Sequence, residues 1–178
     1  MFDLMHFTKT EQEKILKSLT VLVDTREKEG HNDHILSYFD DKKIPWKKET
    51  LVHGDYSFYV PKDEGLNIPR DLYFTNIICI ERKNNLDEWA GNVVDDRQGV
   101  KKKFSQLPKK SIFLIENGNY GDIINHNYRS KYDPRSYLGT LHSIWNEFDI
   151  PIIFMPDQKY TATFIYGYFY YYLRSIIK

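Results

Sequence analysis

Apolar residues occur along this chain in short runs, separated by stretches in which they recur every three or four positions. The short runs predict strands over 19–24, 46–51, 56–60, 72–82, 111–116 and 150–155. The amphipathic stretches predict helices over 10–18, 32–41, 84–93, 100–107, 134–148 and 159–177. Strands separated by helices indicate an α/β fold whose central sheet, mostly parallel or mixed, has helices on both faces.

Local signals refine these boundaries. Thr10 and Glu13 have the spacing of a capping box at the start of the first helix. Pro134 suits the first turn of a later helix, because its missing N–H is not needed there. The segment 61–71 contains two prolines and a glycine and predicts a surface excursion, and 118–132 predicts a polar, irregular connection.

Length and composition indicate one compact domain over 1–178, with 1–18 as an N-terminal helical extension. Of the 178 residues, 41% are apolar and 28% are charged, which is typical of a soluble globular protein. The lone cysteine, Cys79, excludes an internal disulfide and fits a reducing compartment. No signal-peptide pattern occurs, and 163–177 is too short and too rich in tyrosine to span a bilayer. A cytoplasmic protein without a membrane partner is therefore expected.

The most informative pattern is an apolar run, 77–80, that ends in Glu81-Arg82-Lys83. Alternation along a strand places Glu81 and Lys83 on one face and Arg82 on the other. Packing alone does not account for this pattern, because an uncompensated charge at the end of a buried strand is costly. A metal-dependent hydrolytic site does account for it, since the acid can hold a divalent cation and the base can lie beside the attacking water or the scissile phosphate.

Two further acids, Asp24 and Asp55, are expected near strand ends, which gather in one crevice of an open α/β sheet. Carboxylate oxygens suit Mg²⁺ or Mn²⁺, which use one or two protein carboxylates and keep several waters. Asp55 and Glu81 are the expected ligands, with Asp24 as a further ligand, direct or through water. Lys83 would orient or deprotonate the nucleophilic water and offset charge in the transition state, so phosphodiester hydrolysis is the expected reaction.

The triplet 81–83 is not specific by itself. An acid and a lysine two positions apart occur by chance in most proteins, and the ordinary interpretation is a strand that leaves the core into a solvated charge pair. Asp24 and the Gly54-Asp55 pair upstream favour the site over coincidence.

The ordered motifs resemble the XPF/Hef-type structure-specific nuclease domain of the PD-(D/E)xK nuclease superfamily. That family has an Asp-x-Arg-Glu strand end, a Gly-Asp-Tyr and a Glu-Arg-Lys-x-x-x-Asp. The matching residues here are Asp24-Thr25-Arg26-Glu27, Gly54-Asp55-Tyr56, and Glu81-Arg82-Lys83 followed by Asp87. Weaker matches at 96–97, 115–118, 137–144, 150–153 and 161–162 extend the resemblance over nearly the whole chain.

This resemblance implies a restriction-endonuclease-like three-layer fold and a Mg²⁺- or Mn²⁺-dependent endonuclease that acts on duplex DNA beside branches, flaps or gaps. The catalytic residues that it implies are Asp24, Asp55, Glu81 and Lys83, with Glu27 as a supporting acid. It also implies that three residues support these groups or contact DNA: Arg26, Arg82 and Asp87. For Arg82 an ion pair behind the sheet is an alternative, and for Asp87 a favourable charge at a helix start.

The chain also departs from the family pattern. Members commonly carry a tandem helix-hairpin-helix module after the nuclease domain, and the sequence up to Lys178 contains none, so a stand-alone nuclease domain is expected. Lys101 stands where the family tends to have glutamine.

Evidence for DNA binding must be local, because the net charge is zero. A basic cluster follows the proposed site in sequence and predicts phosphate contacts; it comprises Arg97, Lys101, Lys102, Lys103, Lys109 and Lys110. Without the nuclease motifs, a solvated helix face would be the better interpretation. His31 and His34 have zinc-like spacing, but no nearby cysteine or third ligand completes a site.

The last helix, 159–177, is apolar nearly all round, which indicates either deep burial or an interface. Because relatives pair through their nuclease domains, the resemblance implies a homodimer through this helix and the helix at 134–148.

Two functions of different classes remain. One is a metal-dependent DNA endonuclease, and the other is a catalytically silent domain that binds branched DNA or a partner nuclease. Every core catalytic position holds a competent residue, which favours the enzyme. A Holliday-junction resolvase or a phage-encoded nuclease of the same superfamily also fits the sequence.

Overall fold

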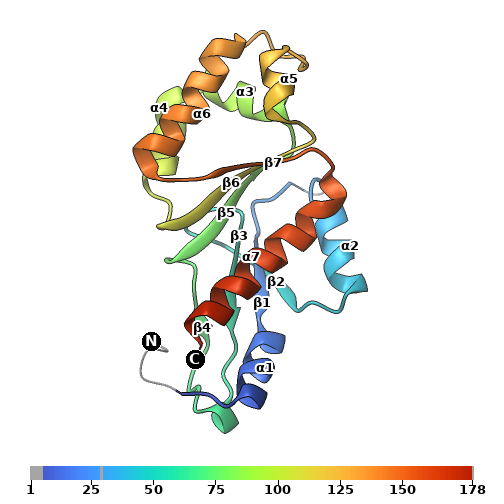
Figure 1. Ribbon diagram of the computed structural model, residues 1–178, viewed down its shortest axis with the longest axis vertical. Coiled ribbons are helices and arrows are strands. Elements are labelled where there is room, and N and C mark those ends of the chain that lie inside the picture. The colour runs from blue at the N-terminus through green and yellow to red at the C-terminus, as the bar shows by residue number, and fades with distance from the viewer. Residues whose placement is uncertain (1–5, 29, 178) are drawn as a thin grey trace.

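The computed structural model describes residues 6–28 and 30–177 (Figure 1). Its strands are β1 (Thr20–Asp24), β2 (Trp46–Glu49), β3 (Tyr56–Val60), β4 (Leu72–Tyr73), β5 (Ile78–Lys83), β6 (Lys110–Glu116) and β7 (Ile152–Met155). Its α-helices are α1 (Lys9–Ser18), α2 (Asp33–Asp41), α3 (Leu86–Asp95), α4 (Arg97–Ser105), α5 (Tyr120–Ile124), α6 (Pro134–Phe148) and α7 (Thr161–Ile176). The described residues also form the 3₁₀ turns η2 (Glu64–Leu66) and η3 (Gln158–Tyr160). Within the described ranges, no helix is long and apolar enough to cross a membrane.

The strands form one mixed sheet in the order β2-β1-β3-β5-β6-β7, with β4 also pairing with β3. The pairs β1–β2, β5–β6 and β6–β7 are parallel, whereas β3 runs antiparallel to β1, β4 and β5. Parallel neighbours need a crossover, and α2, the α3–α4 pair and the α5–α6 pair supply one each. The predicted α/β class, with a mixed sheet between helices, is confirmed.

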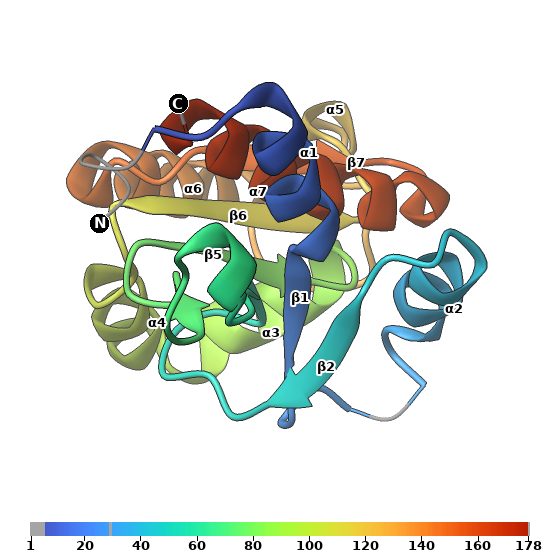
Figure 2. The same ribbon diagram turned by 90° about the horizontal axis from the view of Figure 1, so that it is seen from below.

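Helices lie on both sides of the sheet (Figures 1 and 2). The first face packs against α1, α2 and α7, and its strand residues include Val21, Phe58 and Ile80. The second face packs against α3 to α6 around Trp89, Phe104 and Phe113. None of the buried apolar residues in this second cluster comes from β1 to β4. The helices α3 to α6 therefore cover the second face of β5 to β7 but not that of β1 to β4.

The turn before β3 depends on a glycine. Gly54 has φ of +68°, and a Cβ atom there would lie 2.8 Å from Sγ of Cys79 and 3.0 Å from the carbonyl oxygen of Ile80. A glycine is therefore needed for both the backbone conformation and the close approach of this turn to β5. The next residue, Asp55, is thereby held against the middle of the sheet.

Three local expectations were wrong. The predicted strand 72–82 is divided into β4 and β5, because a turn closes between them where the Ile77 N–H donates to the Phe74 carbonyl over 2.8 Å. The capping box of α1 is formed by Thr8 and Glu11 rather than by Thr10 and Glu13.

The third error concerns 118–132, which was expected to be irregular but contains α5. Asn119 and Asp122 form a capping box at the start of that helix. The helix has only five residues, too few for an apolar period to be visible in the sequence.

Candidate active site

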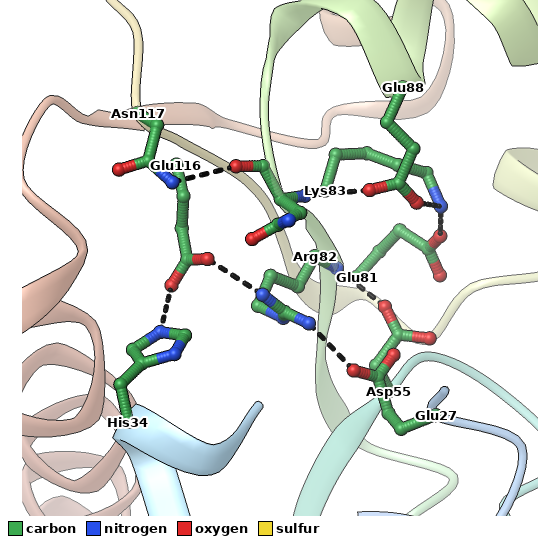
Figure 3. Close-up of polar contacts among 10 residues, drawn as sticks. Glu27, His34, Asp55, Glu81, Arg82, Lys83, Glu88, Glu116 and Asn117 are labelled. Atoms are coloured by element: carbon green, nitrogen blue, oxygen red, sulfur yellow. Dashed lines mark hydrogen bonds and ion pairs between the residues drawn. The ribbon is translucent and has the colours of Figure 1, made fainter. Parts of the chain in front are cut away.

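The end of β5 places Glu81 and Lys83 on the second face of the sheet and sends Arg82 to the first (Figure 3). Glu81 has no exposed surface, and 13% of the Lys83 side chain is exposed. This is the division between faces that alternation predicts. Glu81 and Lys83 therefore meet in a largely dehydrated environment.

Asp55 reaches this pair from the neighbouring strand. Its backbone N–H donates to the Ile80 carbonyl over 2.8 Å, and its Oδ2 accepts from the Arg82 N–H over 2.6 Å. Burial raises the pKa of Asp55 to about 8, and the negative charge of Glu81 adds to this effect. The two carboxylates are thus close enough to repel each other, although their sequence positions are far apart.

Two ammonium groups share a single oxygen of Glu81. Lys103 Nζ lies 2.6 Å from Oε1 and Lys83 Nζ lies 3.1 Å from it. The other oxygen, Oε2, is buried and has no hydrogen-bond partner among the described residues. Sequence reasoning placed Lys103 on a DNA-binding surface and missed this contact, because only the packing of α4 beneath Phe113 brings its side chain to β5.

The charge state of Lys83 follows from its neighbours. Burial lowers the pKa of Lys83, but the negative charges of Glu81, Asp55 and Glu88 outweigh burial and raise it above the usual value. Glu88 Oε1 lies 3.8 Å from Lys83 Nζ. Lys83 therefore keeps its positive charge in this environment.

Asp24 ends β1 beside Asp55, and its backbone N–H donates to the Asp55 carbonyl over 2.9 Å. Its carboxylate is bound by Arg26, through the backbone N–H at 3.0 Å and through the guanidinium. Among the residues described, no three His, Cys, Asp or Glu side chains are gathered so as to hold a metal ion. The structure therefore brings Asp55 and Glu81 together and keeps the Asp24 carboxylate on Arg26.

A hard divalent cation fits the remaining donors. Mg²⁺ and Mn²⁺ need only one or two carboxylates when water completes their coordination. Oε2 of Glu81 is a buried carboxylate oxygen without a hydrogen-bond partner among the described residues, and Asp55 supplies the second carboxylate beside it. These two residues fit Mg²⁺ or Mn²⁺, and Asp24 could act through water.

Arg82 joins a separate buried network on the first face (Figure 3). Its guanidinium donates to Glu116 over 2.6 Å and to Glu27 over 2.7 Å. Glu116 also bonds Nε2 of His34 over 2.9 Å, and the His34 and Arg82 partners hold the pKa of Glu116 below its usual value in spite of burial. Arg82 and Glu27 therefore tie the loop after β1 to β5 and β6. Glu116 was visible in the sequence as a strand-end acid, but its partners were not.

Asp87 lies in the first turn of α3 and anchors a distant loop. Its Oδ1 accepts from the backbone N–H groups of Arg129 and Ser130 over 2.8 and 2.7 Å. In this position it fixes the segment before α6.

A cleft of about 560 Å³ opens over these groups. Its lining includes Asp24, Arg26, Asp55, Lys83, Lys102 and Lys103.

The predicted basic cluster is divided around this cleft. Lys101 is paired with Glu147 of α6 at 2.7 Å, and Lys110 lines a groove beside α7 instead. Arg97 and Lys109 are exposed.

Residues 23–168 match the model of the family described as "ERCC4 domain". Two solved structures of XPF from Aeropyrum pernix have a similar fold. One has a TM-score of 0.59 and 19% identity, and the alignment covers 84% of this chain and 59% of that one. The other, a complex with DNA, has a TM-score of 0.61 and 18% identity, with coverage of 88% and 66%. This chain thus spans less than two thirds of those XPF chains. A search of curated proteins finds no match.

Proposed function

Because this chain belongs to the ERCC4 domain family of XPF-type nucleases, which are typically structure-specific DNA endonucleases, we propose that it cuts branched, flapped or junction DNA with Mg²⁺ or Mn²⁺. The observation that carries the proposal is the meeting of Asp55 and Lys83, which line the cleft, with the buried Glu81 beside them. Burying two carboxylates and one ammonium costs desolvation free energy. Three uncharged side chains would fill the same space at a lower cost, so packing alone does not explain these residues.

Asp55 and Glu81 are the groups that would hold the cation. When bound, Mg²⁺ or Mn²⁺ supplies Lewis-acid activation of a water and neutralisation of phosphate charge. Asp55 is positioned for this by two backbone contacts, to Ile80 and from Arg82, so that its carboxylate needs little reorganisation.

Lys83 would orient the attacking water and stabilise negative charge that develops on the scissile phosphate. Its raised pKa makes it a poor proton acceptor but a lasting positive charge. The sequence left open whether Lys83 orients the water or deprotonates it. The raised pKa favours orientation, together with stabilisation of negative charge.

Asp24 and Arg26 would act at the edge of the same cleft. The Arg26 side chain is 65% exposed although it is bound to Asp24. A guanidinium that is held by a carboxylate yet open to solvent can bind a DNA phosphate beside the cut. Lys102 and Lys103 line the opposite wall and would contact further phosphates.

The test is cleavage of a panel of labelled flaps, forks, junctions and plain duplex with Mg²⁺ or Mn²⁺, with a chelator as the control. Asp55→Ala and Lys83→Ala are expected to reduce cleavage by at least about 100-fold while remaining folded. Unchanged cleavage in both variants contradicts the site. Absence of cleavage by the wild type with either metal favours a catalytically silent DNA-binding or nuclease-binding domain.

A homodimer through α6 and α7 is part of the proposal. Trp145 of α6 is 45% exposed and Tyr171 of α7 is 64% exposed. A groove of about 500 Å³ beside α7 is lined by aromatic residues that include Phe164, Tyr168 and Tyr172. Light scattering tests this assembly: a dimeric mass that becomes monomeric in Tyr171→Glu supports it, and a monomeric wild type rejects it.

A further inference from the structure

A tyrosine pair lies on the sheet face that carries the proposed active site. Tyr59 of β3 and Tyr73 of β4 are direct partners in the ladder, and their rings are stacked with centroids 5.1 Å apart and planes 15° apart. Tyr73 is 43% exposed. Neither ring belongs to the buried clusters of the two cores. An aromatic surface is therefore presented to solvent where β3 pairs with β4.

The strand register fixes which face this is. Tyr56, Phe58 and Val60 point into the core of the first face, so Tyr59 points to the second face, as does Asp55. Tyr59 lies four positions after Asp55 along the extended chain, which corresponds to about 13 Å. Stacked nucleotides rise about 3.4 Å each, so the ring pair lies about four nucleotides from the proposed cut.

Lys47 of β2 completes the surface. Its Nζ lies 4.2 Å from the ring centroid of Tyr59 and donates to the Tyr73 hydroxyl over 3.0 Å. The same ammonium pairs with Glu49 at 2.8 Å. Because Glu49 offsets this charge, the surface attracts a ligand through its rings more than through its charge.

We propose that the Tyr59–Tyr73 pair, held by Lys47, is a stacking platform for the unpaired DNA strand that leaves the cleavage site along β3. This proposal rests on the proposed nuclease function and adds that the protein recognises the unpaired strand of its DNA substrate. Duplex bases are already stacked on each other, so their faces are closed to an exposed ring, whereas unpaired bases stack on tyrosine without sequence preference. The lysines of α4 across the cleft suit the phosphates of the paired region. The two surfaces together would select the border between duplex and single strand.

The test uses fluorescence anisotropy without metal, so that binding is measured apart from cleavage. The probes are a labelled oligothymidylate and a labelled blunt duplex. Tyr73→Thr keeps strand propensity but removes the ring, and it is expected to weaken oligothymidylate binding by about five- to tenfold while duplex binding is unchanged. This ratio to the wild type should be the same at low and high salt, because stacking releases no counterions.

Two controls separate stacking from a general effect on the fold. Tyr73→Phe keeps the ring and is expected to bind oligothymidylate as the wild type does. Tyr120→Thr removes a tyrosine of α5 that is 42% exposed and contacts Phe154 of β7, at the other end of the sheet, and is expected to leave oligothymidylate binding unchanged. Thermal melts of each variant confirm folding.

Unchanged oligothymidylate binding in Tyr73→Thr overturns the platform, and so does an equal loss for duplex or in Tyr120→Thr. These outcomes differ from a failure of the proposed function. Metal-dependent cleavage with Tyr73-independent binding rejects the platform alone. Tyr73-dependent binding without any cleavage rejects the nuclease alone.

Discussion

The ammonium of Lys103 lies 2.6 Å from Oε1 of Glu81, although Glu81 belongs to the buried strand β5 and Lys103 belongs to the following helix pair. Lys83 is already bound to the same oxygen, at 3.1 Å. Two cations therefore balance the carboxylate pair of Glu81 and Asp55. A divalent ion that enters has to compete with them, and Lys103, whose side chain is 49% exposed, is the one that can move away.

Replacing Lys103 should therefore strengthen metal binding. We expect Lys103→Met to bind Mn²⁺ about three- to fivefold more tightly than the wild type, in proportion to the loss of one partly exposed ion pair. Isothermal titration calorimetry without DNA measures this. Lys102→Met is the matched control, since Lys102 lines the same cleft without a hydrogen bond or ion pair to Glu81 among the described contacts. An equal gain in both variants would show that only general electrostatics is involved.

Asp55 should make the metal-free fold less stable as the pH rises. Its ordinary pKa is 3.8 and its folded-state pKa is about 8. Below the first value both states are protonated and the residue has no effect. Between the two values the unfolded chain releases its proton more readily, so folding is increasingly disfavoured, up to a limit reached above about pH 8.

Asp55→Asn cannot ionise and keeps an oxygen for the Arg82 N–H. It is expected to raise the melting temperature by at least about 2–4 °C at pH 8, and by less at pH 5. Melting curves in the presence of a chelator measure this difference. A variant that is less stable than the wild type at pH 8 would contradict the raised pKa.

Arg82 is expected to act through stability rather than through substrate. Its side chain is 3% exposed, and Arg82→Met would leave Glu116 and Glu27 without their shared cation. Loss of one partner from a buried ion pair costs about 3–5 kcal/mol, to be measured by urea unfolding. Lys62→Met is the control, because the side chains of the Lys62–Glu64 ion pair are 52% and 79% exposed, and it should cost less than about 1 kcal/mol. Equal costs would show that the Arg82 network is not buried in solution.

Gly54→Ala is expected to destabilise the protein by more than about 1 kcal/mol and to reduce cleavage, because a left-handed residue gains a Cβ that contacts Cys79. Gly139→Ala is the matched control, since a Cβ there meets nothing within 4 Å. The measurements are urea unfolding and cleavage of a flap substrate. A loss of cleavage without a loss of stability would show that the turn matters for the position of Asp55 alone.

Much of this arrangement is local and could be read from the chain. Successive side chains of a strand point to opposite faces of the sheet. Glu81 and Lys83 could therefore be assigned to one face and Arg82 to the other from the sequence. Pro134 marked the start of α6, and the apolar runs marked the strands, because these preferences act within a few residues. The errors lay where the sequence allows two local structures. Two residue pairs could form the capping box of α1, and the segment 72–82 could form one strand or two strands joined by a turn.

The sequence by itself determined the fold class and the charged groups at the strand ends, because backbone periodicity and the cost of burying charge do not depend on distant partners. Only the tertiary structure decided which of those groups meet. Asp55 lies beside Glu81 because β3 runs antiparallel to β5, and Lys103 reaches Glu81 because α4 packs on Phe113. Arg82 meets Glu27 from the loop after β1 and Glu116 from β6, and Glu116 in turn bonds His34 of α2. Contacts of this kind depend on the order of strands and the packing of helices, which a local pattern does not contain.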